Sequence, residues 1–203
     1  MNFRILLSLG LAALFVFMYV PVALSHPHVF IDNTIKILFD QHGLAGIRAK
    51  WVFDEFFSSM IANDYDRNRN ARFEKAEIEM IRKKAFSNLA NFGYFTFIKI
   101  NGRPFKVKYA RDFSAALSGG KLTYAFFVPC HVKAISTFKE LRISQYDPTY
   151  YTSMAFAKKR PVILEAGSGF NINYRISKNM EEAYYYDQIH PVEVILRFKL
   201  KDG

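Results

Sequence analysis

The stretch that decides the fold is residues 29–53, VFIDNTIKILFDQHGLAGIRAKWVF. Apolar and polar residues alternate in both of its halves, as in strands that bury one face. Between the halves, Asp40-Gln41-His42-Gly43 has turn chemistry, so we expect an antiparallel hairpin. The alternating apolar positions are Val29, Ile31, Ile35 and Ile37 in the first half, and Ile47, Ala49, Trp51 and Phe53 in the second.

A helical pattern follows this hairpin. Asp54 can cap a helix through its carboxylate. A polar loop, residues 64–72, separates a first helix from a second one expected over Phe73–Phe92. The helical insertion therefore covers about residues 54–91. The apolar faces are formed by Phe56, Phe57, Met60 and Ile61 in the first helix, and by Ile78, Ile81, Ala85 and Leu89 in the second.

After Gly93 the pattern returns to strands. Asn101-Gly102 and Ser118-Gly119-Gly120 mark two hairpin turns. Short strands at regular spacing indicate an α+β protein, a mostly antiparallel β-sandwich or open barrel with an inserted EF-hand-like helical hairpin. Residues 26–203 form a single β-rich domain on this prediction. The expected strands are Tyr94–Ile100, Phe105–Tyr109, Phe113–Leu117, Leu122–Val128, Leu141–Tyr146, Tyr151–Phe156, Val162–Glu165, Phe170–Ile176 and Val192–Leu200.

The first 25 residues have the pattern of a secretory signal peptide. Arg4 supplies a positive start, the run from Ile5 to Leu24 is almost wholly apolar, and Ala23-Leu24-Ser25 is a small-x-small cleavage signal. We expect cleavage before His26 and export to the periplasm as a soluble protein. The alternative is a retained N-terminal membrane anchor, since the run is long enough to span a bilayer.

Composition narrows the function classes. Cys130 is the only cysteine, so no disulfide can form within the chain, and we expect it to be a buried apolar residue. The formal charge is +10, yet no basic helix is interleaved with stacking aromatics, so nucleic acid is not an expected partner. Hydrolase elbows, phosphate loops and zinc-protease motifs are absent from the sequence, which favours a protein that is not an enzyme.

The loop between the two helices has the spacing of a calcium loop. With Asp66 at position 1, Asn68 and Asn70 fall at positions 3 and 5, and Glu77 falls at position 12. Those positions supply side-chain oxygens in an EF-hand, and Arg72 at position 7 would supply its main-chain carbonyl. The sequence therefore predicts a possible calcium site in this loop, with Glu74 at position 9 able to act through water.

Two features weaken this prediction. Ala71 occupies position 6, where the sharp turn of the loop favours glycine, and a Cβ in a left-handed conformation costs about 1–2 kcal/mol. Nearby positive charges and few carboxylates imply weak affinity, in the ~10⁻⁴–10⁻³ M range of extracellular sites. The alternative is a degenerate loop that only joins two helices. The basic residues are Arg67, Arg69, Arg72 and Lys75.

Cleavage before His26 would create a second candidate metal site. The α-amine and imidazole of His26 could chelate one transition metal, with His28 as a further nitrogen ligand. Pro27 has no amide proton, so the square-planar mode that uses a deprotonated second amide is unavailable. Ligands from elsewhere in the fold are then needed. The further candidates are Asp32, His131 and His190.

Several motifs together resemble a known family. In chain order they are His26-Pro-His-Val-Phe, Trp51-Val-Phe-Asp-Glu-Phe-Phe-Ser, the EF-hand-like loop, Asn91-Phe-Gly-Tyr-Phe-Thr, Arg111-Asp-Phe-Ser-Ala and Tyr146-Asp-Pro-Thr-Tyr-Tyr. On these motifs the chain is similar to the bacterial domain of unknown function 1007 family. That family's loop commonly carries acidic ligands and glycine, from which Asn68, Asn70 and Ala71 depart.

The resemblance implies a periplasmic protein without an established reaction. Members are often labelled as a periplasmic component of an ABC-type transport system and are often encoded beside nickel/cobalt-type transporters. We therefore expect a divalent-metal-binding accessory of a metal-ion transport system for nickel, cobalt or zinc, with an inner-membrane transporter as partner. The alternatives are a structural or interaction module with a degenerate EF-hand, and a copper enzyme that uses an N-terminal histidine.

Overall fold

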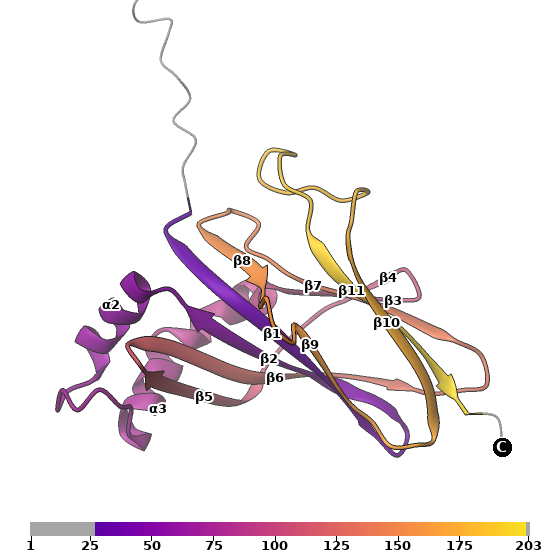
Figure 1. Ribbon diagram of the computed structural model, residues 1–203, viewed down its shortest axis with the longest axis horizontal. Coiled ribbons are helices and arrows are strands. Elements are labelled where there is room, and N and C mark those ends of the chain that lie inside the picture. The colour runs from indigo at the N-terminus through magenta and orange to yellow at the C-terminus, as the bar shows by residue number, and fades with distance from the viewer. Residues whose placement is uncertain (1–26, 202–203) are drawn as a thin grey trace, which may run out of the picture.

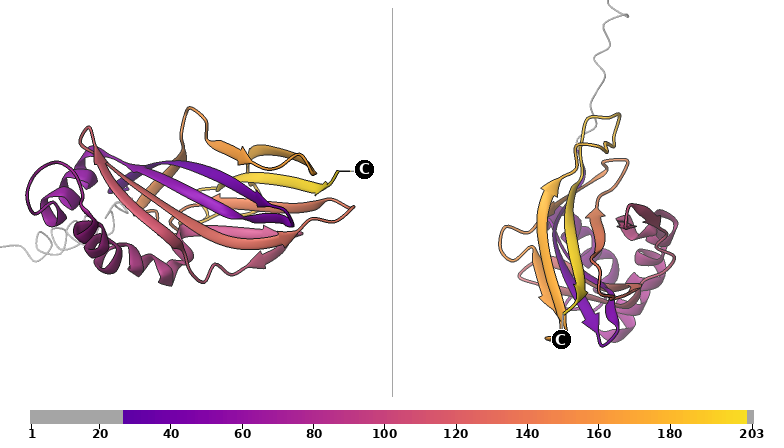
Figure 2. Two further views of the ribbon diagram at one scale, coloured as in Figure 1. Left: turned by 90° about the horizontal axis from the view of Figure 1, so that it is seen from below. Right: turned by 90° about the vertical axis from the view of Figure 1, so that its right-hand side faces the viewer.

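The protein is a two-layer β-sandwich with a helical hairpin inserted at one end (Figure 1). The structure is a computed structural model that describes residues 27–201. The strands form two separate sheets and neither closes on itself within these residues, which confirms the α+β prediction in its sandwich form. Figure 2 shows the helices gathered at the end of the long axis opposite the C-terminus.

The first sheet contains six strands and is built on the predicted hairpin. Its strands run in the order β5-β6-β2-β1-β8, and β9 also pairs with β1. Strands β1 and β2 pair antiparallel, as their alternation predicts, with Ile37 opposite Ile47. The strands are β1 (Val29–Asp40), β2 (Gly43–Phe53), β5 (Arg111–Ser118), β6 (Lys121–Lys133), β8 (Thr152–Phe156) and β9 (Val162–Glu165).

The second sheet contains five strands, all paired antiparallel. Its order is β10-β11-β7-β3-β4. The Asn101-Gly102 turn joins β3 to β4, which confirms that hairpin. The strands are β3 (Thr96–Ile100), β4 (Arg103–Phe105), β7 (Lys139–Gln145), β10 (Phe170–Lys178) and β11 (Val192–Leu200).

One strand prediction fails. Strand β4 ends at Phe105 and does not continue to Tyr109; Pro104 lies in this edge strand and removes one main-chain donor. The pairing is mostly antiparallel, as predicted, and the exceptions are β8 and β9, which both run parallel to β1 along one of its edges. Alternation within a strand gives its buried face but not its neighbour.

The helical insertion is longer and more broken than predicted. Helix α2 covers Glu55–Tyr65 and α3 covers Lys75–Lys84, after which a 3₁₀ segment, η1, covers Phe86–Phe95. The single helix expected over 73–92 is therefore wrong. Helix α3 ends at Lys84 with Ala85 as its cap, and the last residues of η1 leave helical geometry, with φ of 57° at Gly93.

Helix α2 is fixed to the first sheet at its beginning. Asp54 accepts the main-chain N–H of Phe57 at 2.9 Å, which confirms its role as a cap. Ser58 is fully buried and its hydroxyl accepts the N–H of Leu122 in β6 at 2.9 Å. The predicted apolar face is only partly covered, because Ile61 is buried while Phe56 and Met60 stay 70% and 45% exposed.

Trp51 lies at the centre of the core and joins the two sheets. It is 1% exposed and packs edge-on against Phe126 of β6, with ring centroids 4.8 Å apart. Its indole Nε1 donates to Oε1 of Gln145 in β7 at 3.3 Å, and Gln145 Nε2 donates to Thr96 at 2.7 Å. A polar chain thus links the layers through an otherwise apolar interior.

One inward position of β1 is polar. Asn33 alternates with Ile31 and Ile35 on the buried face and is 2% exposed. Within residues 27–201 its Oδ1 has no hydrogen-bond partner. A buried oxygen left unpaired costs about 1–3 kcal/mol, so this residue is not explained by packing.

Two further features are the lack of a membrane-spanning helix in the described residues and the burial of Cys130. No helix within residues 27–201 is long and apolar enough to cross a membrane. The predicted leader, residues 1–25, lies outside the described residues, as does His26. Cys130 is buried, as predicted, and burial raises the pKa of its thiol to about 12.

Candidate functional site

The loop from Asp66 to Glu77 joins α2 to α3 and folds around the side chain of its first residue. Asp66 is 8% exposed. One of its carboxylate oxygens accepts the N–H of Asn70 at 3.2 Å, and the other accepts that of Ala71 at 2.9 Å. These bonds draw the chain into a tight turn about a carboxylate at predicted position 1.

The two asparagines hold the middle of the loop in the same way. Asn68 Oδ1 accepts the N–H of Asn70 at 3.1 Å, and Asn70 Oδ1 accepts the N–H of Arg72 at 2.9 Å. Side-chain oxygens that bond main-chain N–H groups two residues on form local turns of the Asx kind. Positions 1, 3 and 5 are therefore each oriented by the loop itself.

Glu77 closes the loop from its far end. It is 5% exposed, and its two carboxylate oxygens accept the N–H of Arg67 at 2.8 Å and the N–H of Glu74 at 2.9 Å. The carboxylates at positions 1 and 12 are thus both buried and attached to the same loop.

Glu74 has a role that the sequence interpretation missed. It forms a capping box with Glu77 at the start of α3, and the side-chain amides of Asn68 and Asn70 donate to it. The Glu77 side chain first, and then Asn68 and Asn70, lower the pKa of the Glu74 carboxyl to about 2. Half of the signal was present, because Glu77 is the Glu that such a box has at the third helical position, but Glu74 stands where the box usually has Ser or Thr.

Ala71 adopts the conformation that its position demands. Its φ is 60°, in the left-handed region, where alanine is strained and glycine is not. Arg69 is left-handed as well, with φ of 56°. The loop therefore has the sharp turn at position 6 despite the Cβ there.

His28 lies at the start of β1, against the connection between β7 and β8. Its main-chain N–H donates to the carbonyl of Tyr151 at 2.9 Å, and the two rings lie 5.0 Å apart. In the part of the chain that the structure describes, no three His, Cys, Asp or Glu side chains gather as a metal site. Asp32, His131 and His190 are not brought together with His28 as such a group.

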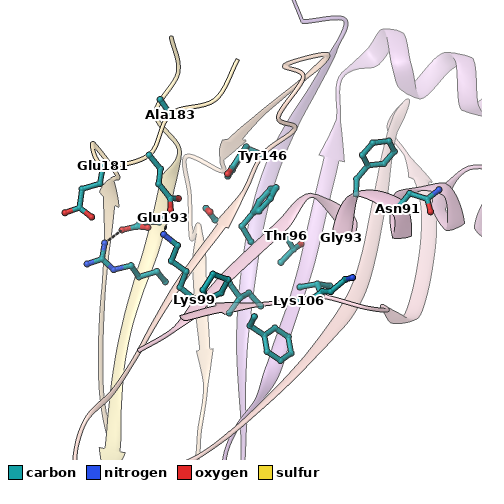
Figure 3. A pocket seen from close by; sticks show the side chains of 18 of the residues that line it. Asn91, Gly93, Thr96, Lys99, Lys106, Tyr146, Glu181, Ala183 and Glu193 are labelled. Carbon is teal, nitrogen blue, oxygen red and sulfur yellow. Dashed lines mark hydrogen bonds and ion pairs between the residues drawn. The ribbon is translucent and has the colours of Figure 1, made fainter. Parts of the chain in front are cut away.

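A charged cavity lies at one end of the second sheet (Figure 3). It has a volume of about 660 Å³ and is lined by η1, β3, β4, β7, β11 and residues 181–183. Figure 3 shows Lys99, Glu193 and Tyr146 around it. The alternating pattern predicted most of these strands. It could not predict the cavity, because the charged residues that line it are far apart in the sequence.

Most charges in this cavity are already paired. Lys99 pairs with Glu182. Glu193 is 4% exposed; one oxygen lies 3.2 Å from Arg142 Nη1, and the other accepts Asn179 Nδ2 at 3.3 Å. Hydrogen bonding to Glu140 is the largest cause that raises the pKa of Arg142. A charged ligand would have to displace these ion pairs.

Comparison with known proteins places this fold and loop in one family. The family model described as "Protein of unknown function (DUF1007)" matches residues 11–191, which is most of the chain. The chain belongs to this family. The membership confirms the resemblance seen in the motifs, and it assigns no reaction.

Two relatives support the same conclusion. The chain is 30% identical over 128 residues to the uncharacterized 15.5 kDa protein in the trpE 3' region of Spirochaeta aurantia, a match that covers 63% of this chain and 91% of that protein. It is also 30% identical over 165 residues to an uncharacterized protein of Haemophilus influenzae, covering 78% and 76% of the two chains.

Proposed function

We propose that this DUF1007 protein is a non-enzymatic periplasmic protein that binds a divalent cation and serves a metal-ion transport system. The observation that carries the proposal is the pair of buried carboxylates, Asp66 and Glu77, held at the two ends of one loop. Each accepts two main-chain N–H groups from within that loop. A calcium ion would add the positive charge that two buried carboxylates lack.

The charges around the loop support binding of calcium, though weak binding. Within residues 27–201, neither Asp66 nor Glu77 has a Lys or Arg ion-pair partner, although Arg67, Arg69 and Arg72 lie in the same segment. The asparagines contribute neutral oxygens. Affinity in the ~10⁻⁴–10⁻³ M range of extracellular sites fits this ligand set.

Calorimetry with calcium chloride tests the proposal. We expect heat of binding at millimolar calcium, and we expect Glu77→Gln to weaken binding at least about tenfold because it removes the carboxylate at position 12. Glu79→Gln is the matched control, since Glu79 lies on the same helix and pairs with Arg82 at the surface. Absence of heat in the natural protein, or equal binding by Glu77→Gln, would contradict the proposal.

A transition-metal site at His26 and His28 remains a second part of the proposal. It depends on cleavage before His26, which would free the α-amine as a ligand. His28 is exposed, with its ring 5.0 Å from that of Tyr151, and this exposure supports access to an ion. Nickel, cobalt, zinc and copper are the ions that imidazole and amine ligands suit.

The proposed transporter partner would contact helix α2. Phe56 and Met60 lie four residues apart on one face of this helix and are 70% and 45% exposed. Exposed apolar residues grouped in this way are typical of interaction surfaces. The same observation favours the alternative of an interaction module, in which the loop only stiffens the hairpin.

Replacing both Phe56 and Met60 by serine tests this surface without disturbing the fold. We expect Phe56→Ser with Met60→Ser to change the free energy of unfolding by less than about 0.5 kcal/mol. We expect the same variant to lose most of its co-sedimentation with liposomes that contain the reconstituted metal transporter of the same organism. Phe138→Ser, at a site 40% exposed on another part of the surface, is the control. Unchanged co-sedimentation of the double variant would exclude this face.

A further inference from the structure

A second cavity lies between the two sheets, away from the loop and from the charged cavity. It has a volume of about 310 Å³ and is bounded by β1 and β8 on one side and by residues 184–192 and the end of β10 on the other. Pockets of this size accommodate small organic molecules. Its lining includes two buried amides, three tyrosines and one histidine.

Asn33 is one of these amides, and it has a free acceptor. The residue lines the cavity, and within the described residues its buried Oδ1 has no hydrogen-bond partner. Gln145 lines the same cavity, but both ends of its amide are engaged, by Trp51 and by Thr96. Of these two amides, Asn33 is therefore the one that lacks a partner within the described residues and can bond a ligand.

Three tyrosine rings form the wall near this amide. The rings of Tyr146 and Tyr184 stack with centroids 4.4 Å apart, and Tyr150 meets Tyr184 at 6.4 Å. Burial first, and neighbouring Tyr150 next, raise the pKa of Tyr184 to about 12, so its ring is neutral at physiological pH. Neutral aromatic faces of this kind attract organic cations.

The charge around the cavity also favours a cation. Among the described residues that line it there is no lysine or arginine, in a chain of net charge +10. Asp147, which adjoins Tyr146 in the chain, is 4% exposed, and its carboxylate accepts bonds from Thr149 and Thr152. No lysine or arginine of residues 27–201 forms an ion pair with it.

His190 adds a second acceptor. Its Nδ1 lies 2.7 Å from the main-chain carbonyl of Glu182, so Nδ1 is the nitrogen that donates. In the neutral ring Nε2 is then left with a free lone pair. The cavity offers hydrogen-bond acceptors and aromatic faces together.

We propose that this inter-sheet cavity binds a small organic ammonium ion, with the ammonium N–H donating to Asn33 Oδ1 and the carbon part packed against the tyrosines. The proposal is independent of the calcium loop. It explains why a polar residue occupies the inward series of β1, where Ile31 and Ile35 are its neighbours.

Calorimetry with two matched probes tests it. The cation is 2-phenylethylammonium, and the neutral analogue is 2-phenylethanol. We expect the ammonium probe to bind at least about tenfold more tightly than the alcohol. Equal affinity, or no binding of the ammonium probe at millimolar concentration, would overturn the proposal.

Variants locate the binding to this cavity. Asn33→Leu removes the acceptor and should lose at least about tenfold in affinity for the ammonium probe, while its melting temperature should rise, because it replaces an unpaired buried amide by an apolar side chain. Asn173→Leu, at an exposed position of β10, should bind as the natural protein does. Natural affinity in Asn33→Leu would overturn the assignment, and Glu77→Gln should leave probe binding unchanged.

Discussion

Trp51→Ala is expected to destabilise the protein by about 3–5 kcal/mol, because it opens a cavity at the centre of the core. The side chain is 1% exposed and packs against Phe126 and Phe53. The variant also leaves Gln145 Oε1 without its indole donor, and a buried acceptor without a partner adds to the cost. Urea unfolding followed by circular dichroism measures the difference.

Trp51→Phe separates packing from hydrogen bonding. It keeps most of the ring and loses the N–H, so we expect a loss of about 1–2 kcal/mol. Trp51 is the only tryptophan, so neither variant has tryptophan fluorescence, and unfolding is followed by circular dichroism. A loss below about 1 kcal/mol for Trp51→Ala would show that the two layers do not depend on this residue.

Arg142→Met is expected to destabilise the protein by about 1–3 kcal/mol at neutral pH, because it leaves the Glu193 carboxylate buried without its guanidinium partner. The lower end of this range is favoured, since the Arg142 side chain is 33% exposed and solvent screens the pair. The measurement is the free energy of unfolding in urea at neutral pH.

Arg197→Met is the control, because Arg197 is 53% exposed and lies 3.9 Å from Glu140. We expect it to change the free energy of unfolding by less than about 0.5 kcal/mol. An equal loss of stability in the two variants would contradict this explanation.

Much of the fold could be predicted because strand signals are local. Alternation over residues 29–53 predicts β1, β2 and their pairing, and the boundaries expected for β9 and β11 agree with the structure to the residue. The break at Ala85 was not predictable from spacing, because the apolar stripe continues through it into η1. The parallel partners of β1 depend on contacts far apart in the chain.

The residues of the candidate sites could likewise be predicted only where they lie close together in the sequence. The loop positions 66, 68, 70 and 77 follow from spacing in one segment, and the structure holds all four in one turn-rich loop. Asn33 also carried a local signal, a polar residue in an inward apolar series, which the sequence interpretation did not use. The Arg142–Glu193 pair joins two strands and gave no such signal.

Strand β1 is paired along both of its edges, and this affects how the chain folds. Residues 31–40 make one ladder with β2, which follows directly, but the other edge of β1, at residues 29–38, is covered by residues 152–165. Because synthesis starts at the N-terminus, the hairpin of β1 and β2 can form early. The outer edge of β1 keeps unpaired N–H and C=O groups until most of the polypeptide has been made. Closing that edge is a long-range, slow step. During it, the newly made protein is vulnerable to pairing with other chains, and a chaperone that shields residues 29–38 would act where protection is needed most.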